Sequence, residues 1–253
     1  MSEELQAAIA HLDTYGYCLL PARLPREEAL ALGARCLALH DDPACADAIV
    51  GDQYYQTLFG MLNLDDRVWQ CAFHRDTLAI ARHFLGSCRV VEACSKPCWP
   101  GAPAQALHVD SAHHFHQVPD VPWMINTIWM LSDFTVENGA TGIVPLSHRS
   151  RLKTPPPEVG HDSELIAAVA GEAGSVLLWH GGAWHQARAN TSAEIRLGLN
   201  IAYYPRWFNN WVEGGHQPLW PETYARLPQE YRALVPGRKS SVLERLRVEE
   251  GHR

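Results

Sequence analysis

The sequence lacks the features that direct a chain to a membrane, to nucleic acid or to export. It has no apolar run of 18 residues, so we expect no membrane-spanning helix. Its 21 basic residues are outnumbered by 28 acidic ones, and a net charge of −7 argues against nucleic acid as a partner. The first residues, MSEELQAAIAHLDTYG, form an acidic amphipathic pattern without a basic start, which predicts no signal peptide.

Paired cysteines are also missing. The seven cysteines are an odd number and include no C-x-x-C pair. We therefore interpret them as reduced thiols of a cytoplasmic protein. Cys94 and Cys98 are two potential zinc ligands, but no second pair accompanies them, so a zinc site is not expected there.

No linker rich in Ser, Gly or Pro divides the 253 residues, which favours a single domain. Residues 1–86 are predicted to be mainly helical, with a short strand at 16–21 and a helix at 25–40. A further helix lies in DTLAIARHFLG, where Asp76 is the expected N-terminal cap and Gly86 the expected end.

The pattern changes from residue 87 to residue 205, where short runs rich in β-branched and aromatic residues alternate with Gly, Pro and Asn. Seven such runs are present: RVVEACSKPCW, AQALHVD, MINTIWML, TGIVPL, GSVLLWH, AWHQARAN and IRLGLNIAYY. They predict a β-sandwich or barrel. The expected fold is therefore mainly β with flanking helices, followed by a helical or irregular tail at 206–253.

One stretch, LHVDSAHHF at residues 107–115, concentrates potential metal ligands. On an extended segment His108 and Asp110 share a face, because strand side chains alternate with period two. A third ligand is offered by GSVLLWHGGAWH, which contains His180 and His185 on either side of a glycine turn. This spacing makes it unlikely that both histidines face one ion.

His185 is favoured because Arg196 follows it by 11 residues across the turn ANTSAE. A hairpin there would return the guanidinium to the neighbourhood of the histidine. Two histidines and one carboxylate leave three coordination positions open, which is the arrangement of non-haem Fe(II) oxygenases. An arginine nearby can bind the far carboxylate of a keto acid through two parallel hydrogen bonds.

Four ordered motifs together resemble the phytanoyl-CoA dioxygenase family of Fe(II)/2-oxoglutarate oxygenases. They are residues 107–110, SDFTVENGATGIVPLSH (132–148), GSVLLWHGGAWH (174–185) and NTSAEIR (190–196). The opening TYGYCLLPARLPREEA is also similar to the family's usual start, so the resemblance covers about residues 14–205. It implies a double-stranded β-helix, the jelly-roll barrel shared with cupins. It also implies that 2-oxoglutarate and O2 are consumed, that a C–H bond is hydroxylated or otherwise oxidised, and that succinate is released.

The resemblance carries over residue by residue. It implies three iron ligands, namely His108, Asp110 and His185. It implies four residues around 2-oxoglutarate, in the style of members that act on natural products: Arg196, Gln105, Thr141 and Trp129. For Trp129, a place in the hydrophobic core is an equally good interpretation. Iron halogenases of this type lack the carboxylate ligand, so the presence of Asp110 favours hydroxylation or a related oxidation.

The sequence departs from the family pattern at two positions. Leu146 replaces the glycine of the usual PGSH, and Ala187 replaces a hydroxyl residue that often contacts 2-oxoglutarate. The nine tryptophans favour a small, apolar, natural-product-type substrate. Five residues near the iron are expected to contact it: His114, Phe115, Trp123, Trp207 and Phe208.

Two other classes of function remain open at this point. One is a different metal enzyme on the same barrel, such as a cupin isomerase, which would not need Arg196. The other is a binding protein that keeps the barrel without its metal, although all three ligand positions are intact. The expected partner is a small molecule, and the chain is expected to be a monomer or a homodimer.

Overall fold

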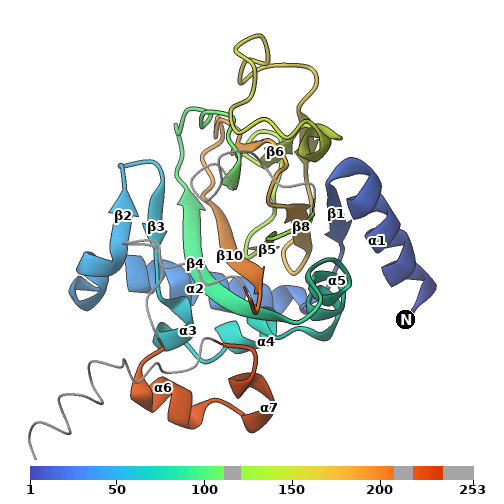
Figure 1. Cartoon of the computed structure of the whole chain (residues 1–253). Helices are drawn as coiled ribbons and strands as arrows, with labels where there is room; N and C mark the ends of the chain where they lie inside the picture. Colours follow the sequence, from blue (N-terminus) through green and yellow to red (C-terminus); the bar gives the residue numbers. More distant parts are fainter. Residues whose placement is uncertain (111–120, 208–218, 236–253) are drawn as a thin grey trace, which may run out of the picture.

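Figure 1 shows the computed structural model, which describes residues 1–110, 121–207 and 219–235. Its strands form two sheets. The larger sheet has seven strands in the order β1-β8-β5-β10-β4-β3-β2, and the smaller has three in the order β7-β6-β9. All described strand pairs are antiparallel. Two antiparallel sheets with flanking helices confirm the predicted fold class, a jelly-roll barrel.

The elements have the following bounds. The strands are β1 (Tyr17–Leu20), β2 (Ile49–Gly51), β3 (Gln56–Leu58), β4 (Cys88–Cys98), β5 (Ile125–Met130), β6 (Thr141–Ile143), β7 (Ala167–Val169), β8 (Val176–His180), β9 (His185–Ala187) and β10 (Arg196–Pro205). The α-helices are α1 (Glu3–Tyr15), α2 (Arg26–His40), α3 (Met61–Leu64), α4 (Val68–Ala72), α5 (Arg75–Leu85), α6 (Pro221–Arg226) and α7 (Gln229–Arg232). Two 3-10 helices are η1 (Pro43–Ala48) and η3 (Ser147–Arg149). Within the described ranges, no helix meets both the length and the hydropathy that a bilayer crossing requires.

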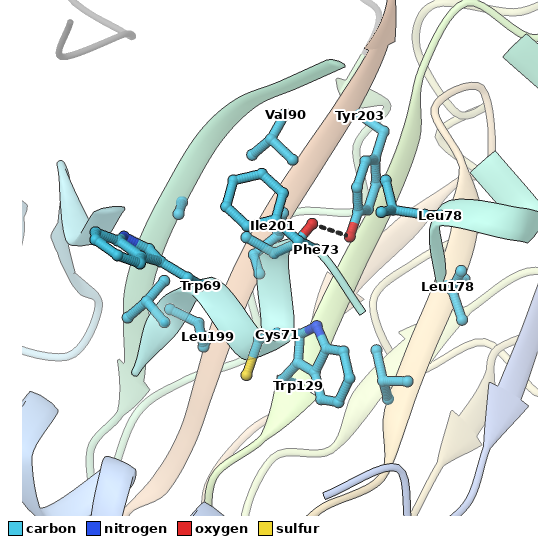
Figure 2. Packing of buried hydrophobic residues seen from close by; sticks show 14 of the residues in the cluster. Trp69, Cys71, Phe73, Leu78, Val90, Trp129, Leu178, Leu199, Ile201 and Tyr203 are labelled. Atoms are coloured by element: carbon cyan, nitrogen blue, oxygen red, sulfur yellow. Dashed lines mark hydrogen bonds between the residues drawn. The ribbon is translucent and has the colours of Figure 1, made fainter. Parts of the chain in front are cut away.

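Helices cover the outer face of the larger sheet, and the main hydrophobic core lies between these helices and the sheet. On β10, Leu199, Ile201 and Tyr203 belong to this core, whereas Arg196 and Asn200 line a cavity on the other face. Figure 2 shows the three core residues beside side chains of α4 and α5. The alternation of β10 therefore separates an apolar layer toward the helices from a polar layer inside the barrel.

The first 86 residues contribute more to the sheet than the sequence predicts. β1, the predicted short strand, pairs with β8 at one edge. At the other edge β2 and β3 pair with each other, and β3 contacts β4 through Leu58 and Ser95. β2 and β3 have only three residues each and are partly exposed, so they carry too little hydrophobic pattern to be recognised.

The start of α5 differs from the prediction. The helix begins at Arg75, and the side chain of His74 accepts a hydrogen bond from the Asp76 amide at 3.3 Å. Asp76 therefore lies in the first turn, where it pairs with Arg23 at 3.0 Å. The predicted end is confirmed, because Gly86 follows the last helical residue and its amide donates to the Arg82 carbonyl.

Six of the seven predicted β runs contain a strand, but residues 104–110 do not. In this segment the amide of Gln105 donates to Ala187 and that of His108 donates to His185. Residues 106 and 107 thus lie opposite the single residue 186, a bulge that interrupts the ladder and leaves only an isolated bridge at His108. All seven cysteines are free and buried, as expected for reduced thiols.

Leu146 adopts a left-handed backbone conformation with φ +67°, which explains why the family pattern has glycine there. Its side chain is 49% exposed and so contributes little burial. A left-handed backbone conformation destabilises an L-residue by roughly 1–2 kcal/mol, and glycine removes this strain. About half of that gain is lost again, because the more flexible glycine loses more conformational entropy on folding. We therefore expect Leu146→Gly to raise the melting temperature by about 1–3 °C.

Leu165→Gly is a matched control for this prediction. Leu165 is also exposed, at 60%, and is not among the residues with positive φ. Differential scanning calorimetry should show a lower melting temperature for Leu165→Gly and a higher one for Leu146→Gly. If both variants lost the same stability, the left-handed turn would carry no strain.

Candidate metal centre and co-substrate pocket

Three potential metal ligands converge inside the barrel. One ligand atom from each of His108, Asp110 and His185 can be chosen so that all three lie within 4.8 Å of one another. His185 Nε2 lies 3.4 Å from Asp110 Oδ2, and His108 Nε2 lies 4.0 Å from Asp110 Oδ1. No other cluster of three such side chains occurs among the residues that the structure describes. Cys94 and Cys98 are thus not part of a metal-binding group there.

Backbone carbonyls orient both imidazoles. Nδ1 of His108 lies 2.9 Å from the Ala106 carbonyl, and Nδ1 of His185 lies 3.0 Å from the Ala183 carbonyl. A carbonyl can only accept, so each Nδ1 carries the proton and donates it. The lone pair of each ring is then on Nε2, the atom that faces Asp110. This is the tautomer that a histidine needs to bind a metal through Nε2.

The Asp110 carboxylate is held by two side chains from the larger sheet. Oδ2 accepts a hydrogen bond from Asn126 Nδ2 at 2.8 Å and one from Trp179 Nε1 at 3.1 Å. These contacts tie the short segment that carries Asp110 to β5 and β8. They fix the orientation of the carboxyl group, as second partners of metal ligands commonly do.

The pKa shifts of this cluster favour the protonation states that a cation needs. Burial, reinforced by the nearby His185, lowers the pKa of His108 to about 4. Burial alone would raise the pKa of Asp110, but the neighbouring His185 and His108 outweigh it and lower that pKa below its usual range. At neutral pH the cluster therefore contains a neutral His108 and a charged carboxylate.

Arg196 lies at the wall of the cavity that His108 and His185 also line. It is 3% exposed, and its Nε donates to the Gly139 carbonyl at 3.1 Å while its guanidinium lies over the Phe134 ring at 4.9 Å. In the described part of the chain no carboxylate lies within 4.0 Å of it. Burial lowers the pKa of Arg196, which is the expected effect on a cation that has no anionic partner.

The ENGAT motif contributes to this arrangement through Gly139. Gly139 has φ +85°, and a Cβ built on it would lie 2.6 Å from the Arg188 carbonyl. Only glycine fits this position without a clash. Its carbonyl is the acceptor for Arg196, so the turn sets the direction of the guanidinium.

Two further predicted residues line the same cavity. Thr141 enters it from β6, and Gln105 enters it from the bulged segment before His108. The side-chain oxygen of Gln105 accepts the amide of Ala187 at 3.1 Å, which leaves only its amide nitrogen to donate into the cavity. Ala187 also lines the cavity, and its methyl group offers no hydroxyl there.

The route by which Arg196 reaches this site differs from the predicted hairpin. β9, which carries His185, belongs to the smaller sheet, whereas β10, which carries Arg196, belongs to the larger one. The turn between them crosses from one sheet to the other. The two side chains line the same cavity because the sheets face each other across the barrel.

The structure does not place Trp129 at the cavity. Alternation along β5 directs Asn126 and Ile128 inward, toward Asp110 and the cavity, and directs Trp129 outward. Trp129 is fully buried in the main core, edge-to-face with His74 at 5.3 Å. Figure 2 shows it near Cys71 and the other core residues. Trp129 therefore lies in the core, which is the alternative interpretation that the sequence left open, and not in the cavity wall.

The expected substrate contacts are not brought together by the described residues. Trp123 is fully buried beside Tyr204, with the two rings 5.6 Å apart, and Trp207 is 69% exposed. Neither lines the cavity. His114, Phe115 and Phe208 lie outside the described residues.

Sequence reasoning missed several polar residues inside the barrel. Asn126 and Trp179 contact Asp110, while Lys96, Asn200 and Tyr55 line the cavity. A signal was present in the strand runs themselves: EACSKPC places Glu92, Cys94, Lys96 and Cys98 at every second position. A polar series of period two within a buried strand indicates a polar interior face.

Comparison with known proteins decides the family. The profile described as "Phytanoyl-CoA dioxygenase (PhyH)" matches residues 12–198. The chain belongs to the phytanoyl-CoA dioxygenase family.

The named relatives of this chain include fungal dioxygenases. The chain is 28% identical to Dioxygenase af480 of Aspergillus fumigatus over 219 residues, which are 81% of this chain and 68% of the relative. It is 32% identical to Dioxygenase andF of Emericella variicolor over 125 residues, which are 47% of this chain and 42% of the relative. The second match thus spans less than half of either protein.

Solved structures share the fold of this phytanoyl-CoA dioxygenase family member. The carbocyclase SnoK from nogalamycin biosynthesis superposes with a TM-score of 0.65 at 21% identity, covering 81% of this chain and 84% of that one. HygX from Streptomyces hygroscopicus, with nickel and 2-oxoglutarate bound, gives a TM-score of 0.67 at 18% identity, covering 84% and 90%. EctD from S. alaskensis with bound Fe gives 0.68 at 22% identity, covering 81% and 77%. At these identities the likeness establishes the barrel fold.

Proposed function

We propose that this protein is an Fe(II)- and 2-oxoglutarate-dependent dioxygenase that oxidises an unactivated C–H bond of a small natural-product-type substrate. His108, Asp110 and His185 would bind the iron, and Arg196 would bind the distal carboxylate of 2-oxoglutarate. The observation that carries this proposal is one cavity whose wall contains both histidines of the His-Asp-His cluster and a buried arginine.

The three donors fit Fe(II) by their chemistry. Two neutral imidazoles and one carboxylate form a set that suits non-haem iron and leaves positions for co-substrate and O2. The Nδ1–carbonyl contacts and the Asn126 and Trp179 contacts to Asp110 already orient the donor atoms. Iron, when bound, supplies the oxidation that couples 2-oxoglutarate decarboxylation to attack on the substrate.

Arg196 separates this proposal from the other metal enzymes that use the barrel. A buried guanidinium without a carboxylate partner is energetically unfavourable. Its presence in the cavity wall therefore indicates that the anionic group of a ligand binds there. A dicarboxylate that chelates the metal at one end and reaches Arg196 at the other meets this need. The fungal relatives are named dioxygenases, and HygX holds 2-oxoglutarate with nickel in the same fold. The first finding supports dioxygenase chemistry, and the second supports 2-oxoglutarate as the co-substrate.

The similarity to solved structures also supports the proposed substrate class. The related structures include the epimerase SnoN with Fe3+, alpha-ketoglutarate and nogalamycin RO, and HygX with hygromycin B. Succinate release, measured with Fe(II), 2-oxoglutarate and O2 against terpenoid, polyketide and amino-acid-derived compounds, tests the proposal. A substrate-dependent increase supports it. If the folded, iron-binding protein released no succinate from 2-oxoglutarate, the proposal would be refuted.

Arg196→Ala is expected to raise the apparent KM for 2-oxoglutarate by about ten- to a hundredfold, because a charge-assisted bidentate contact is worth roughly 1.5–3 kcal/mol. Arg196→Lys should restore only part of this, since an ammonium lacks the planar fork. The measurement is succinate release as 2-oxoglutarate is varied. Arg188→Ala serves as the control, because Arg188 does not line the cavity. An unchanged KM in Arg196→Ala would remove Arg196 from the co-substrate site.

A further inference from the structure

Two buried asparagines, Asn126 of β5 and Asn200 of β10, lie on the interior face of the larger sheet, and the proposed function gives Asn200 no role. Asn200 is opposite Ile128 in the register of the two strands, so the asparagines are diagonal neighbours. Asn126 is 3% exposed and Asn200 is 2% exposed. Buried amides need hydrogen-bond partners, so the contacts of each amide show which way it is turned.

The Asn200 amide has one orientation that satisfies its surroundings. Nδ2 donates to the Thr127 carbonyl at 2.7 Å, and a carbonyl can only accept, so the atom that faces it is the nitrogen. The other hydrogen of Nδ2 is donated to Asn126 Oδ1 at 2.8 Å. On the opposite side, Oδ1 of Asn200 accepts from the Cys94 thiol at 3.6 Å. The Asn200 side chain is therefore held by β5 and β4, independently of Asp110.

The orientation of Asn200 determines that of Asn126. The two ends of a side-chain amide have nearly the same shape, so packing alone does not distinguish the oxygen from the nitrogen. Because Asn200 offers a donor, the Asn126 atom that faces it is the oxygen. Nδ2 of Asn126 is then turned toward Asp110, whose Oδ2 accepts at 2.8 Å. Hydrogen bonds of fixed direction thus run from Asn200 through Asn126 to Asp110.

The Asp110 carboxylate depends on such contacts, because the backbone around it forms no continuous ladder. Residues 104–110 contain no strand, and the nearest bridge is at His108. Oδ2 of Asp110 accepts hydrogen bonds from Asn126 and from Trp179, whereas no hydrogen bond to Oδ1 is formed in the described part of the chain. Oδ1 is therefore the oxygen that is available to a metal.

We propose that Asn200 is a positioning residue of the metal site. By donating to Asn126 Oδ1 it keeps the N–H of Asn126 toward Asp110 Oδ2, and this contact leaves Oδ1 of Asp110 to the metal. The inference rests on the proposed function, in which Asp110 binds Fe(II). The hydrogen bonds of the Asn200 side chain go to Thr127, Asn126 and Cys94 and to none of the proposed ligands, so Asn200 acts through Asn126.

A double-mutant cycle on metal affinity tests this role. Fe(II) affinity is measured without keto acid, by competition with a chromophoric chelator, in wild type, Asn126→Leu, Asn200→Leu and the double variant. Leucine is close in size to asparagine and can neither donate nor accept. We expect Asn126→Leu to weaken Fe(II) binding by about ten- to a hundredfold and Asn200→Leu by about tenfold. The double variant should bind iron like Asn126→Leu, because without Asn126 the orientation of Asn200 no longer reaches Asp110.

The d–d absorption of the Co(II)-loaded protein is a second readout, since it reports the geometry of the ligands around the metal. Both single variants should shift this spectrum relative to wild type, and the double variant should show the spectrum of Asn126→Leu. The melting temperature shows whether each variant is folded. Asn200→Ala, which also removes the donor, is measured in place of Asn200→Leu if the latter fails to fold.

Asn190→Leu is the matched control. Asn190 is 1% exposed, and its Nδ2 likewise donates to two carbonyls, those of Cys98 and Glu194. None of these hydrogen bonds leads to Asp110. Asn190→Leu should therefore lower the melting temperature and leave the Fe(II) affinity and the Co(II) spectrum unchanged.

Two results would overturn the inference while the proposed function stands. Iron affinity and a Co(II) spectrum equal to wild type in folded Asn200→Leu would show that Asn200 does not position the site. The same loss of affinity from Asn200→Leu in the wild-type and Asn126→Leu backgrounds would show that Asn200 does not act through Asn126. If wild-type protein bound neither Fe(II) nor Co(II), the proposed function would fail, and this inference with it.

Discussion

Asp110→Ala is expected to weaken Fe(II) binding by roughly a hundredfold or more and to reduce substrate-dependent succinate formation to background. The substitution removes the one anionic ligand of the proposed iron site, which neutralises one positive charge of the metal. It also leaves the donors of Asn126 and Trp179, at 2.8 and 3.1 Å from Asp110 Oδ2, without their acceptor. These two N–H groups would then point toward a cation, which adds to the loss of affinity.

Iron titration and succinate release at saturating iron measure this effect. Asp162→Ala is a suitable control, because the Asp162 side chain is 87% exposed on the surface. Asp110→Asn, which keeps an oxygen acceptor but no charge, should lie between wild type and Asp110→Ala in iron affinity. Iron affinity and turnover equal to wild type in Asp110→Ala would show that the carboxylate is not a ligand.

His185→Ala is expected to abolish detectable Fe(II) binding at micromolar iron, whereas His180→Ala should retain it. The two residues are close in sequence but have different surroundings. His185 Nε2 faces Asp110 at 3.4 Å, whereas His180 lies beside His148 with the ring centres 5.3 Å apart. Nδ1 of His180 accepts the Gly182 amide at 2.9 Å. His180 is thus a structural residue of the turn that leads to His185.

The two variants should also differ in how much stability they lose. Removing buried His180 leaves the Gly182 amide without its acceptor and costs about 1–3 kcal/mol, so His180→Ala should melt at a lower temperature. His185→Ala removes a side chain from the cavity wall and should lower the melting temperature less in metal-free protein. Calorimetry with and without iron separates the two. Iron binding that survives in His185→Ala and is lost in His180→Ala would reverse the assignment.

Most strands of the barrel could be predicted from the sequence, but the face that each residue of a fully buried strand occupies could not. In INTIWM both faces of β5 are buried, so hydrophobicity does not distinguish inside from outside. The sequence is therefore compatible with Trp129 in the pocket or in the core, and only the packing of the helices against the sheet places it in the core. Asn126 is the polar residue that marks the interior face, through its bond to Asp110.

The local chemistry of the candidate site was determined by the sequence alone. The H-x-D pair, the later His185 and the ENGAT turn are short-range patterns whose physical meaning depends on neighbouring residues only. Gly86 similarly indicates a helix end, because backbone conformation is governed by local sterics. Such features are present before any distant contact forms.

Only the tertiary structure decided how these pieces meet. Arg196 reaches the cavity by a crossing between two sheets, and Lys96 enters it because β4 pairs with β10. Strand pairing is a long-range choice made by the burial of whole faces, and one sequence pattern is compatible with several pairings. The distance between two side chains on different strands therefore depends on the register of the sheets, which no local pattern contains.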